Sequence, residues 1–111
     1  MAYVVTGGTG FIGRHLLGEL SRRGRPIHVL VREQSRERLE RLRLPNVRPL
    51  VGDVTKKDLG VGSGPGDLQG AEIFHLAAVY DLDADEEANR LANVEGTRHV
   101  LEFARRVGAA R

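Results

Sequence analysis

The stretch VVTGGTGFIGRHLL, residues 4–17, constrains the fold of this chain more than any other feature. An apolar run typical of a buried strand is followed by closely spaced glycines, and the glycines are followed by an amphipathic helical pattern. Gly8, Gly10 and Gly13 spell G-x-G-x-x-G, and the letters from Thr6 onward also spell T-G-x-x-G-x-x-G. In both registers a strand turns through glycines into a helix, which brings unpaired main-chain N–H groups to the position of an anion.

The glycines predict a binding loop for the diphosphate of a dinucleotide. The first glycine allows a sharp turn off the strand, Gly10 lets the backbone approach a pyrophosphate, and Gly13 lets the helix pack closely on the sheet. The alternative is that the glycines serve only a tight turn. A phosphate-hydrolysing P-loop is excluded, because no Gly-Lys-Ser/Thr follows. The cofactor-binding residues predicted here are Gly7, Thr9, Gly10, Phe11, Ile12 and Gly13.

Hydrophobic periodicity along the rest of the chain predicts alternating strands and helices. The predicted strands are 2–6, 26–32, 47–51 and 72–77, the predicted helices are 10–23, 34–43 and 85–107, and 60–66 is a glycine-rich loop. Such alternation is typical of an α/β fold with right-handed crossovers. We therefore expect a doubly wound parallel sheet in the order 3-2-1-4, a truncated Rossmann fold with helices on both faces.

Each predicted helix has a side that we expect to face the core. In the first helix this side carries Ile12, Leu16, Leu17 and Leu20, and Gly24 ends the helix. In the second, only Leu39 and Leu42 face inward, and the alternating Glu and Arg residues indicate a solvated face. In the third, the inward residues are Leu91, Val94, Leu101, Ala104 and Val107.

Composition excludes several classes of function. A length of 111 residues suits one domain, and a net charge of +2 gives no support for nucleic-acid binding. Without cysteine there is no disulfide, thiolate catalysis or cysteine-based zinc site. The histidines are scattered, so we expect no metal site, and His75 on an apolar strand is a core residue. No apolar run is long enough for a membrane span, and a strand at residue 2 or 3 leaves no room for a signal peptide, so we expect a cytoplasmic protein.

The residue at the end of the second strand predicts which coenzyme is bound. An acidic residue there accepts a hydrogen bond from the ribose 2′-hydroxyl of NAD, whereas arginine pairs with the 2′-phosphate of NADP. The strand ends in Leu30-Val31-Arg32, which favours NADP, although Glu33 follows directly and would suit NAD. Arg14 is either a second cation for the phosphate or an exposed helix residue.

Asp53 follows the third strand, at the sheet edge where α/β folds bind their ligands. Its carboxylate either accepts a hydrogen bond from the adenine amino group, with Val54 against the ring, or caps a turn.

Four motifs in order resemble the extended short-chain dehydrogenase/reductase superfamily across essentially the whole chain. They are TGGTGFIG for the cofactor loop, GDVT for the adenine site, FHLAAVYD for the fourth strand and its loop, and NVEGTRHVLEFA for the next helix. Within the superfamily, HVLVRE, VGDVTKKDLGV and HLAAVYD look most like the reductases of acyl thioesters, which use NADPH. Nucleotide-sugar epimerases and dehydratases are the alternative, and they more often carry an acidic residue where this chain has Arg32.

The resemblance also implies roles for single residues. Ala77, Ala78 and Val79 would line the cofactor, and Asn93 would support the hydrogen bonds of an active site or simply face solvent. The superfamily transfers hydride with a Tyr-x-x-x-Lys pair. Neither tyrosine of this chain has a lysine four positions later.

We therefore interpret residues 1–111 as the N-terminal NAD(P)-binding part of a longer oxidoreductase, incomplete and inactive alone. A non-catalytic nucleotide-binding module and an inert fragment are the other hypotheses. An uncovered fourth strand predicts self-association through its edge, or through the helix 85–107, which in the superfamily often forms dimers.

Overall fold

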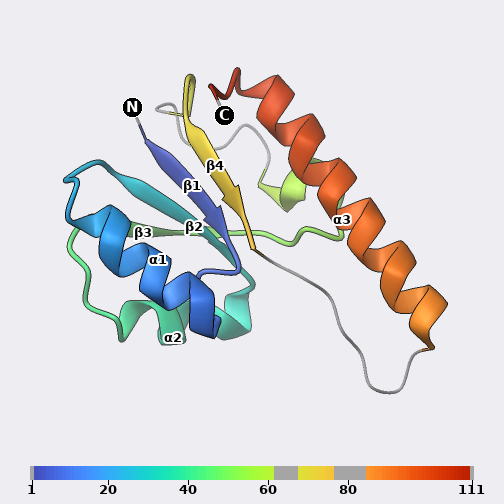
Figure 1. Ribbon diagram of the computed structural model, residues 1–111, viewed down its shortest axis with the longest axis horizontal. Helices are drawn as coiled ribbons and strands as arrows, with labels where there is room; N and C mark the ends of the chain where they lie inside the picture. The colour runs from blue at the N-terminus through green and yellow to red at the C-terminus, as the bar shows by residue number, and fades with distance from the viewer. Residues whose placement is uncertain (1, 62–67, 77–84, 111) are drawn as a thin grey trace.

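The computed structural model describes residues 2–61, 68–76 and 85–110. The described strands are β1 (Tyr3–Thr6), β2 (Ile27–Val31), β3 (Val47–Val51) and β4 (Glu72–His75). The described α-helices are α1 (Phe11–Ser21), α2 (Arg36–Glu40) and α3 (Glu86–Arg106), with short 3-10 helices η1 (Glu33–Ser35) and η2 (Lys57–Gly60). Figure 1 shows α1 and α2 on one face of the sheet and α3 on the other.

The sheet has the predicted order β3-β2-β1-β4, and every neighbouring pair is parallel. Central strand β1 places Tyr3 opposite Ile27 of β2 and Glu72 of β4, so its neighbours run in register from their first residues. Because the strands are parallel, their carboxyl ends meet at one edge. That edge carries the glycine turn after β1 and Asp53 beyond the end of β3.

Residues of β1 alternate between two hydrophobic cores, as a period of two requires. Tyr3 and Val5 belong to the core under α1 and α2, and Val4 belongs to the core under α3. The first core includes Leu17, Leu20, Ile27, Val29, Val31 and Leu39; the second includes Leu30, Leu50, Val54, Leu59, Leu68, Val100 and Phe103. The prediction of helices on both faces is confirmed.

Helix α1 buries Leu17 and Leu20 as predicted, and Leu16 packs against the same core. Gly24 lies just beyond it at φ 75°, and its N–H donates to the Ser21 carbonyl. The prediction for Ile12 is wrong, because its side chain is 69% exposed. Ile12 lies in the first turn of α1, at the carboxyl edge of the sheet, where no core cluster includes it.

The predicted helix 34–43 forms as two short pieces, η1 and α2. Ser35 at their junction makes no capping hydrogen bond with its side chain. Ion pairs one turn apart, Arg36–Glu40 and Arg41–Glu37, lie on the exposed face. Leu39 is buried and Leu42 packs against the core, as predicted.

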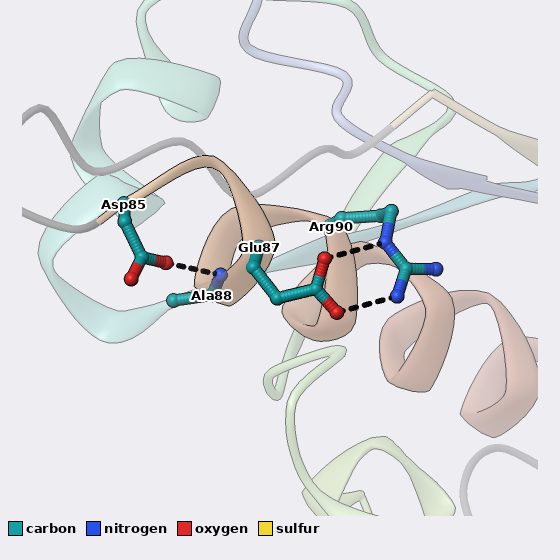
Figure 2. A network of polar contacts seen from close by, with 4 residues as sticks. All are labelled: Asp85, Glu87, Ala88 and Arg90. Carbon is teal, nitrogen blue, oxygen red and sulfur yellow. Dashed lines mark hydrogen bonds and ion pairs between the residues drawn. The ribbon is translucent and has the colours of Figure 1, made fainter.

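Helix α3 begins at a side-chain cap. The Asp85 carboxylate accepts a hydrogen bond from the Ala88 N–H at 2.7 Å, and the Arg90 guanidinium donates to both oxygens of Glu87 (Figure 2). A capping aspartate satisfies one of the N–H groups that a helix start leaves unpaired.

The predicted inward side of α3 is largely wrong. Leu91, Val94 and Leu101 are 50%, 51% and 63% exposed. The buried residues are Asn89, Gly96, Val100 and Phe103, while Ala104 and Val107 are half-buried. A Cβ built on Gly96 would meet the Val54 side chain at 3.4 Å, so the helix approaches its neighbour closely at this residue. Two residues determine which side of α3 is buried. Gly96 lets the helix approach Val54 closely, and Phe103, two turns later, fills the core.

Candidate functional site

The glycine turn after β1 is built from close main-chain contacts. Gly7 has φ 76°, a conformation that side chains disfavour, and its carbonyl accepts the Gly10 N–H at 3.2 Å. A Cβ on Gly13 would lie 2.1 Å from the Gly7 carbonyl oxygen, so only glycine allows α1 to approach the turn this closely. The predicted role of Gly13 in close packing is therefore supported by the geometry.

Gly10 differs from these two glycines. Its φ of −76° suits any residue, and a Cβ there would meet only the Gly7 carbonyl oxygen at an ordinary 3.5 Å. Packing within the described part of the chain therefore does not require glycine at position 10. Gly10 is exposed and stands at the N-cap of α1.

The first turn of α1 offers main-chain donors that its own side chains leave open. Gly10 supplies no capping side chain, and the turn holds no acidic residue. The first N–H groups of a helix have no partner within the helix, and the helix dipole adds positive potential there. Phe11 and Ile12 are 72% and 69% exposed, so this end of α1 is uncovered by the described residues. Thr9 in the same turn is half-buried.

A pocket of about 340 Å³ lies beyond the carboxyl ends of β2 and β3; we call it the carboxyl-edge pocket. It brings together Arg32, Glu33 and Asp53, the three residues that the sequence placed near the nucleotide. Sequence reasoning missed the remaining lining residues, which are Gln34, Val51, Gly52, Lys56 and Gly60. One sequence signal could have indicated Lys56 as a lining residue: it stands three residues after Asp53, in the same turn beyond the third strand.

Asp53 forms the turn that the sequence gave as its alternative role. Its Oδ1 accepts hydrogen bonds from the Thr55 N–H at 2.9 Å and the Thr55 hydroxyl at 2.8 Å. Burial acts to raise the Asp53 pKa, but the two Thr55 hydrogen bonds and the charges of Arg32 and Lys56 outweigh it and hold the pKa below its usual value. The carboxylate is therefore ionised at neutral pH. Contact with an adenine amino group stays a prediction.

Three other predicted residues lie outside this pocket's described lining. The Val54 side chain is buried beside Gly96, and its carbonyl accepts the His99 Nδ1–H at 2.7 Å, so Val54 has a packing role. Arg14 is exposed on α1, and Asn93 is half-buried in α3. Predicted residues Ala77, Ala78 and Val79 lie outside the described residues, as does 62–66 of the predicted loop.

His75 takes part in a polar link that the sequence did not reveal. Its Nδ1 lies 2.6 Å from the Thr6 hydroxyl and its Nε2 lies 3.3 Å from the Thr97 hydroxyl, while the Leu76 N–H donates to the Thr6 hydroxyl oxygen. The ring is half-buried rather than in the core. Burial lowers the His75 pKa below its ordinary value, which favours the neutral ring. The ring joins the ends of β1 and β4 to α3.

Two further features concern only the described residues. They contain no cluster of histidine, aspartate and glutamate side chains suited to hold a metal ion. No helix among them is long and apolar enough to cross a membrane.

Comparison with known proteins assigns this chain to a family. The sequence matches the NAD-binding family described as Male sterility protein over residues 5–111. A putative dihydroflavonol 4-reductase of Synechocystis sp. is 39% identical over 111 residues, which is 98% of this chain and 30% of that protein. The chain thus spans about a third of the length of such relatives.

Solved structures share the fold. Gre2 from Candida albicans, in complex with NADPH, matches with a TM-score of 0.75 at 24% identity, covering 99% of this chain and 34% of Gre2. WbmG from Bordetella bronchiseptica, in complex with NAD, matches with a TM-score of 0.73 at 25% identity, covering 98% of this chain and 35% of WbmG. The strand order, the glycine turn and the match over residues 5–111 agree: the chain belongs to this NAD-binding family, within the extended short-chain dehydrogenase/reductase superfamily.

Proposed function

We propose that this chain is the part of an NADPH-dependent reductase that binds the ADP portion of the coenzyme. The observation that carries the proposal is Gly10, a glycine that packing among the described residues does not require. It stands at the uncapped N-terminus of α1, where main-chain N–H groups stabilise a diphosphate. A bound diphosphate lying against the main chain at position 10 explains why a side chain is missing there.

The carboxyl-edge pocket supports NADP rather than NAD. Arg32 follows β2 directly and lines the pocket, where its guanidinium suits the 2′-phosphate of NADP. Asp53, beyond the end of the neighbouring strand β3, keeps one carboxylate oxygen on Thr55, and we assign to it the contact with the adenine. Glu33 would suit the 2′-hydroxyl of NAD, so coenzyme preference depends on which of the two neighbours dominates.

The reaction that we propose for the whole protein is reduction of an acyl thioester or a related carbonyl compound. Support comes from the resemblance of HVLVRE, VGDVTKKDLGV and HLAAVYD to reductases of that kind, and from the family matched. The Tyr-x-x-x-Lys pair that performs the proton transfer in the superfamily is not present in these 111 residues. Asn93 on α3 would support that chemistry, and this chain would supply coenzyme binding.

Titration of the chain with NADPH, followed by fluorescence or calorimetry, tests the proposal. Gly10→Ala should weaken binding at least about tenfold, because the added methyl group occupies the space of the diphosphate, while it alters stability by only about 1 kcal/mol. Gly18→Ala is the matched control, because a Cβ there has no neighbour within 4 Å in the part of the chain that the structure describes. It should leave the Kd unchanged. Tight binding of NADPH by Gly10→Ala, or no binding by the unaltered chain, would contradict the proposal.

The same titration with NADPH and NADH in parallel tests coenzyme preference. Arg32→Ala should abolish the preference for NADPH by weakening that coenzyme alone, since a hydroxyl gains little from the lost charge. Arg38→Ala, exposed on α2, is the control. Equal affinity of the unaltered chain for the two coenzymes would contradict the NADP assignment while leaving the binding site in place.

A further inference from the structure

The carboxyl-edge pocket holds a second cation, Lys56, which lies on a different segment from Arg32. Arg32 follows β2, whereas Lys56 belongs to the turn that follows β3. Neither side chain forms an ion pair within the described part of the chain. Both positive charges lower the pKa of the Asp53 carboxyl group, so both act within the same pocket.

The main chain fixes the position of Lys56. Its N–H donates to the Asp53 carbonyl at 3.1 Å, and its carbonyl accepts the Leu59 N–H at 3.0 Å. The Asp53 N–H in turn donates to the Leu59 carbonyl at 2.8 Å, which closes the turn. The turn is thus clamped at both ends by hydrogen bonds that do not depend on any side chain facing the pocket.

The backbone after Lys56 is left-handed in consecutive residues. Asp58, Leu59 and Gly60 have φ of 54°, 57° and 67°. Two of these are not glycine, so the conformation costs on the order of 1 kcal/mol each. Burial of Leu59, which is 0% exposed, offsets that cost. The left-handed turn also brings Gly60 beside the Lys56 side chain, where an added Cβ would meet Lys56 Cδ at 3.5 Å.

The balance of charge in the pocket determines what Lys56 can recognise. Arg32 and Lys56 are opposed by Asp53 and Glu33. The Asp53 carboxylate keeps one oxygen on the N–H and hydroxyl of Thr55. With Arg32 as its one cation, the pocket lining would carry a formal charge of −1, because Glu33 and Asp53 are both acidic. Lys56 brings this charge to zero, which removes the net repulsion of an incoming phosphate.

We propose that Lys56 is a second specificity-determining cation for the 2′-phosphate of the coenzyme, acting with Arg32 from the opposite segment. The inference rests on the proposed function, and it assigns a residue that neither the glycine pattern nor the resemblance singles out. A phosphate that bridges two segments gains charge-assisted hydrogen bonds from both, whereas a ribose hydroxyl carries no charge to be neutralised. Lys56 therefore discriminates between the coenzymes rather than strengthening the binding of both.

Two adjacent lysines give a matched pair of variants. Both lysines are exposed, but Lys56 lines the pocket and Lys57 is absent from its described lining. Lys56→Met should weaken NADPH binding about five- to tenfold, the effect of one partly solvated charge-assisted hydrogen bond, and leave the Kd for NADH unchanged. Lys57→Met should change neither Kd, and Lys56→Arg should restore most of the NADPH affinity. Thermal unfolding of each variant controls for folding.

The outcomes separate this inference from the proposed function. If Lys56→Met weakens both coenzymes equally, or neither, Lys56 does not read the phosphate, although the chain still binds the coenzyme. If Lys57→Met has the same effect as Lys56→Met, the effect is one of net charge and the inference fails. If the unaltered chain binds neither NADPH nor NADH, the proposed function fails and this inference fails with it.

Discussion

Tyr3 places its hydroxyl in the core without a hydrogen-bond partner among the described residues. The side chain is fully buried, its ring contacts Phe74 with centroids 5.9 Å apart, and the Arg25 guanidinium lies 5.2 Å from its centroid. The ring therefore contributes packing, whereas the hydroxyl is a buried polar group that loses its water without compensation.

Tyr3→Phe should raise the free energy of unfolding by about 1 kcal/mol, because it removes the unpaired hydroxyl and keeps the ring. Tyr3→Leu should lower it, because both ring contacts are lost. Denaturant unfolding measures the two changes. A destabilised Tyr3→Phe variant would show that the hydroxyl has a partner after all.

Individual site residues differ in how well sequence predicts them. Arg32 and Asp53 follow strands directly, and strands of a parallel sheet end at one edge, so both were predicted to face the ligand. Lys56 was not, because its position depends on the left-handed residues that follow it. Asp58 and Leu59 have no sequence signal for that conformation, since glycine is the residue usually found there.

At the scale of elements, His75 joins β1, β4 and α3 through Thr6 and Thr97. Both ring contacts are satisfied by a neutral ring, with the Thr6 hydroxyl donating to Nδ1 and Nε2–H donating to Thr97. A protonated ring keeps both contacts if the Thr6 hydroxyl turns so that its oxygen accepts from Nδ1–H. What disfavours the charged ring is its burial, which lowers the His75 pKa.

Because the His75 pKa is lower in the folded chain than its ordinary value of 6.5, the unfolded chain binds the proton more tightly. The stabilisation is complete above about pH 6.5 and is lost as the pH falls through the folded-state pKa. The free energy of unfolding should therefore fall between pH 7.5 and pH 5.5, a range above the lowered Asp53 pKa. Denaturant unfolding should show a smaller fall in His75→Gln, and an unchanged fall in His15→Gln, an exposed histidine. Equal pH dependence in all three proteins would contradict this role.

Hydrophobic periodicity predicted the strands of the sheet better than the buried side of helix α3. Strands β1 and β2 are buried on both faces, so their continuous apolar runs could be identified as strands from the sequence. Helix α3 carries apolar residues on more than one side, and a pattern alone does not tell which side is covered. Its orientation depends on Gly96 and Phe103, that is, on how closely one residue lets the helix approach and how well another fills the core.

For the whole molecule, the strand order was predictable because right-handed crossovers leave few arrangements for this alternation. The error on α3 has a consequence at this scale. Leu91, Val94 and Leu101 form an exposed apolar ridge with three- and seven-residue spacing, typical of a helix that packs against another helix. We propose that this ridge is the surface for the predicted association of two chains through the helix 85–107, the alternative to association through the edge of β4.

Leu101→Glu should therefore shift the chain toward monomer, measured by sedimentation equilibrium over a range of concentrations. Arg38→Glu, which adds negative charge on α2 across the sheet, should leave the association constant unchanged. A monomeric unaltered chain at every concentration would contradict both routes. Association that survives Leu101→Glu would leave the β4 edge as the interface.

The turn from Asp53 to Gly60 has an evolutionary consequence. Its closing hydrogen bonds join main-chain atoms, and its buried anchor is Leu59. Residues on its outer rim can thus be exchanged in descendants without refolding the loop. Under the proposed role of Lys56, replacing this one lysine would lower the preference of a lineage for NADPH, with the loop inherited intact.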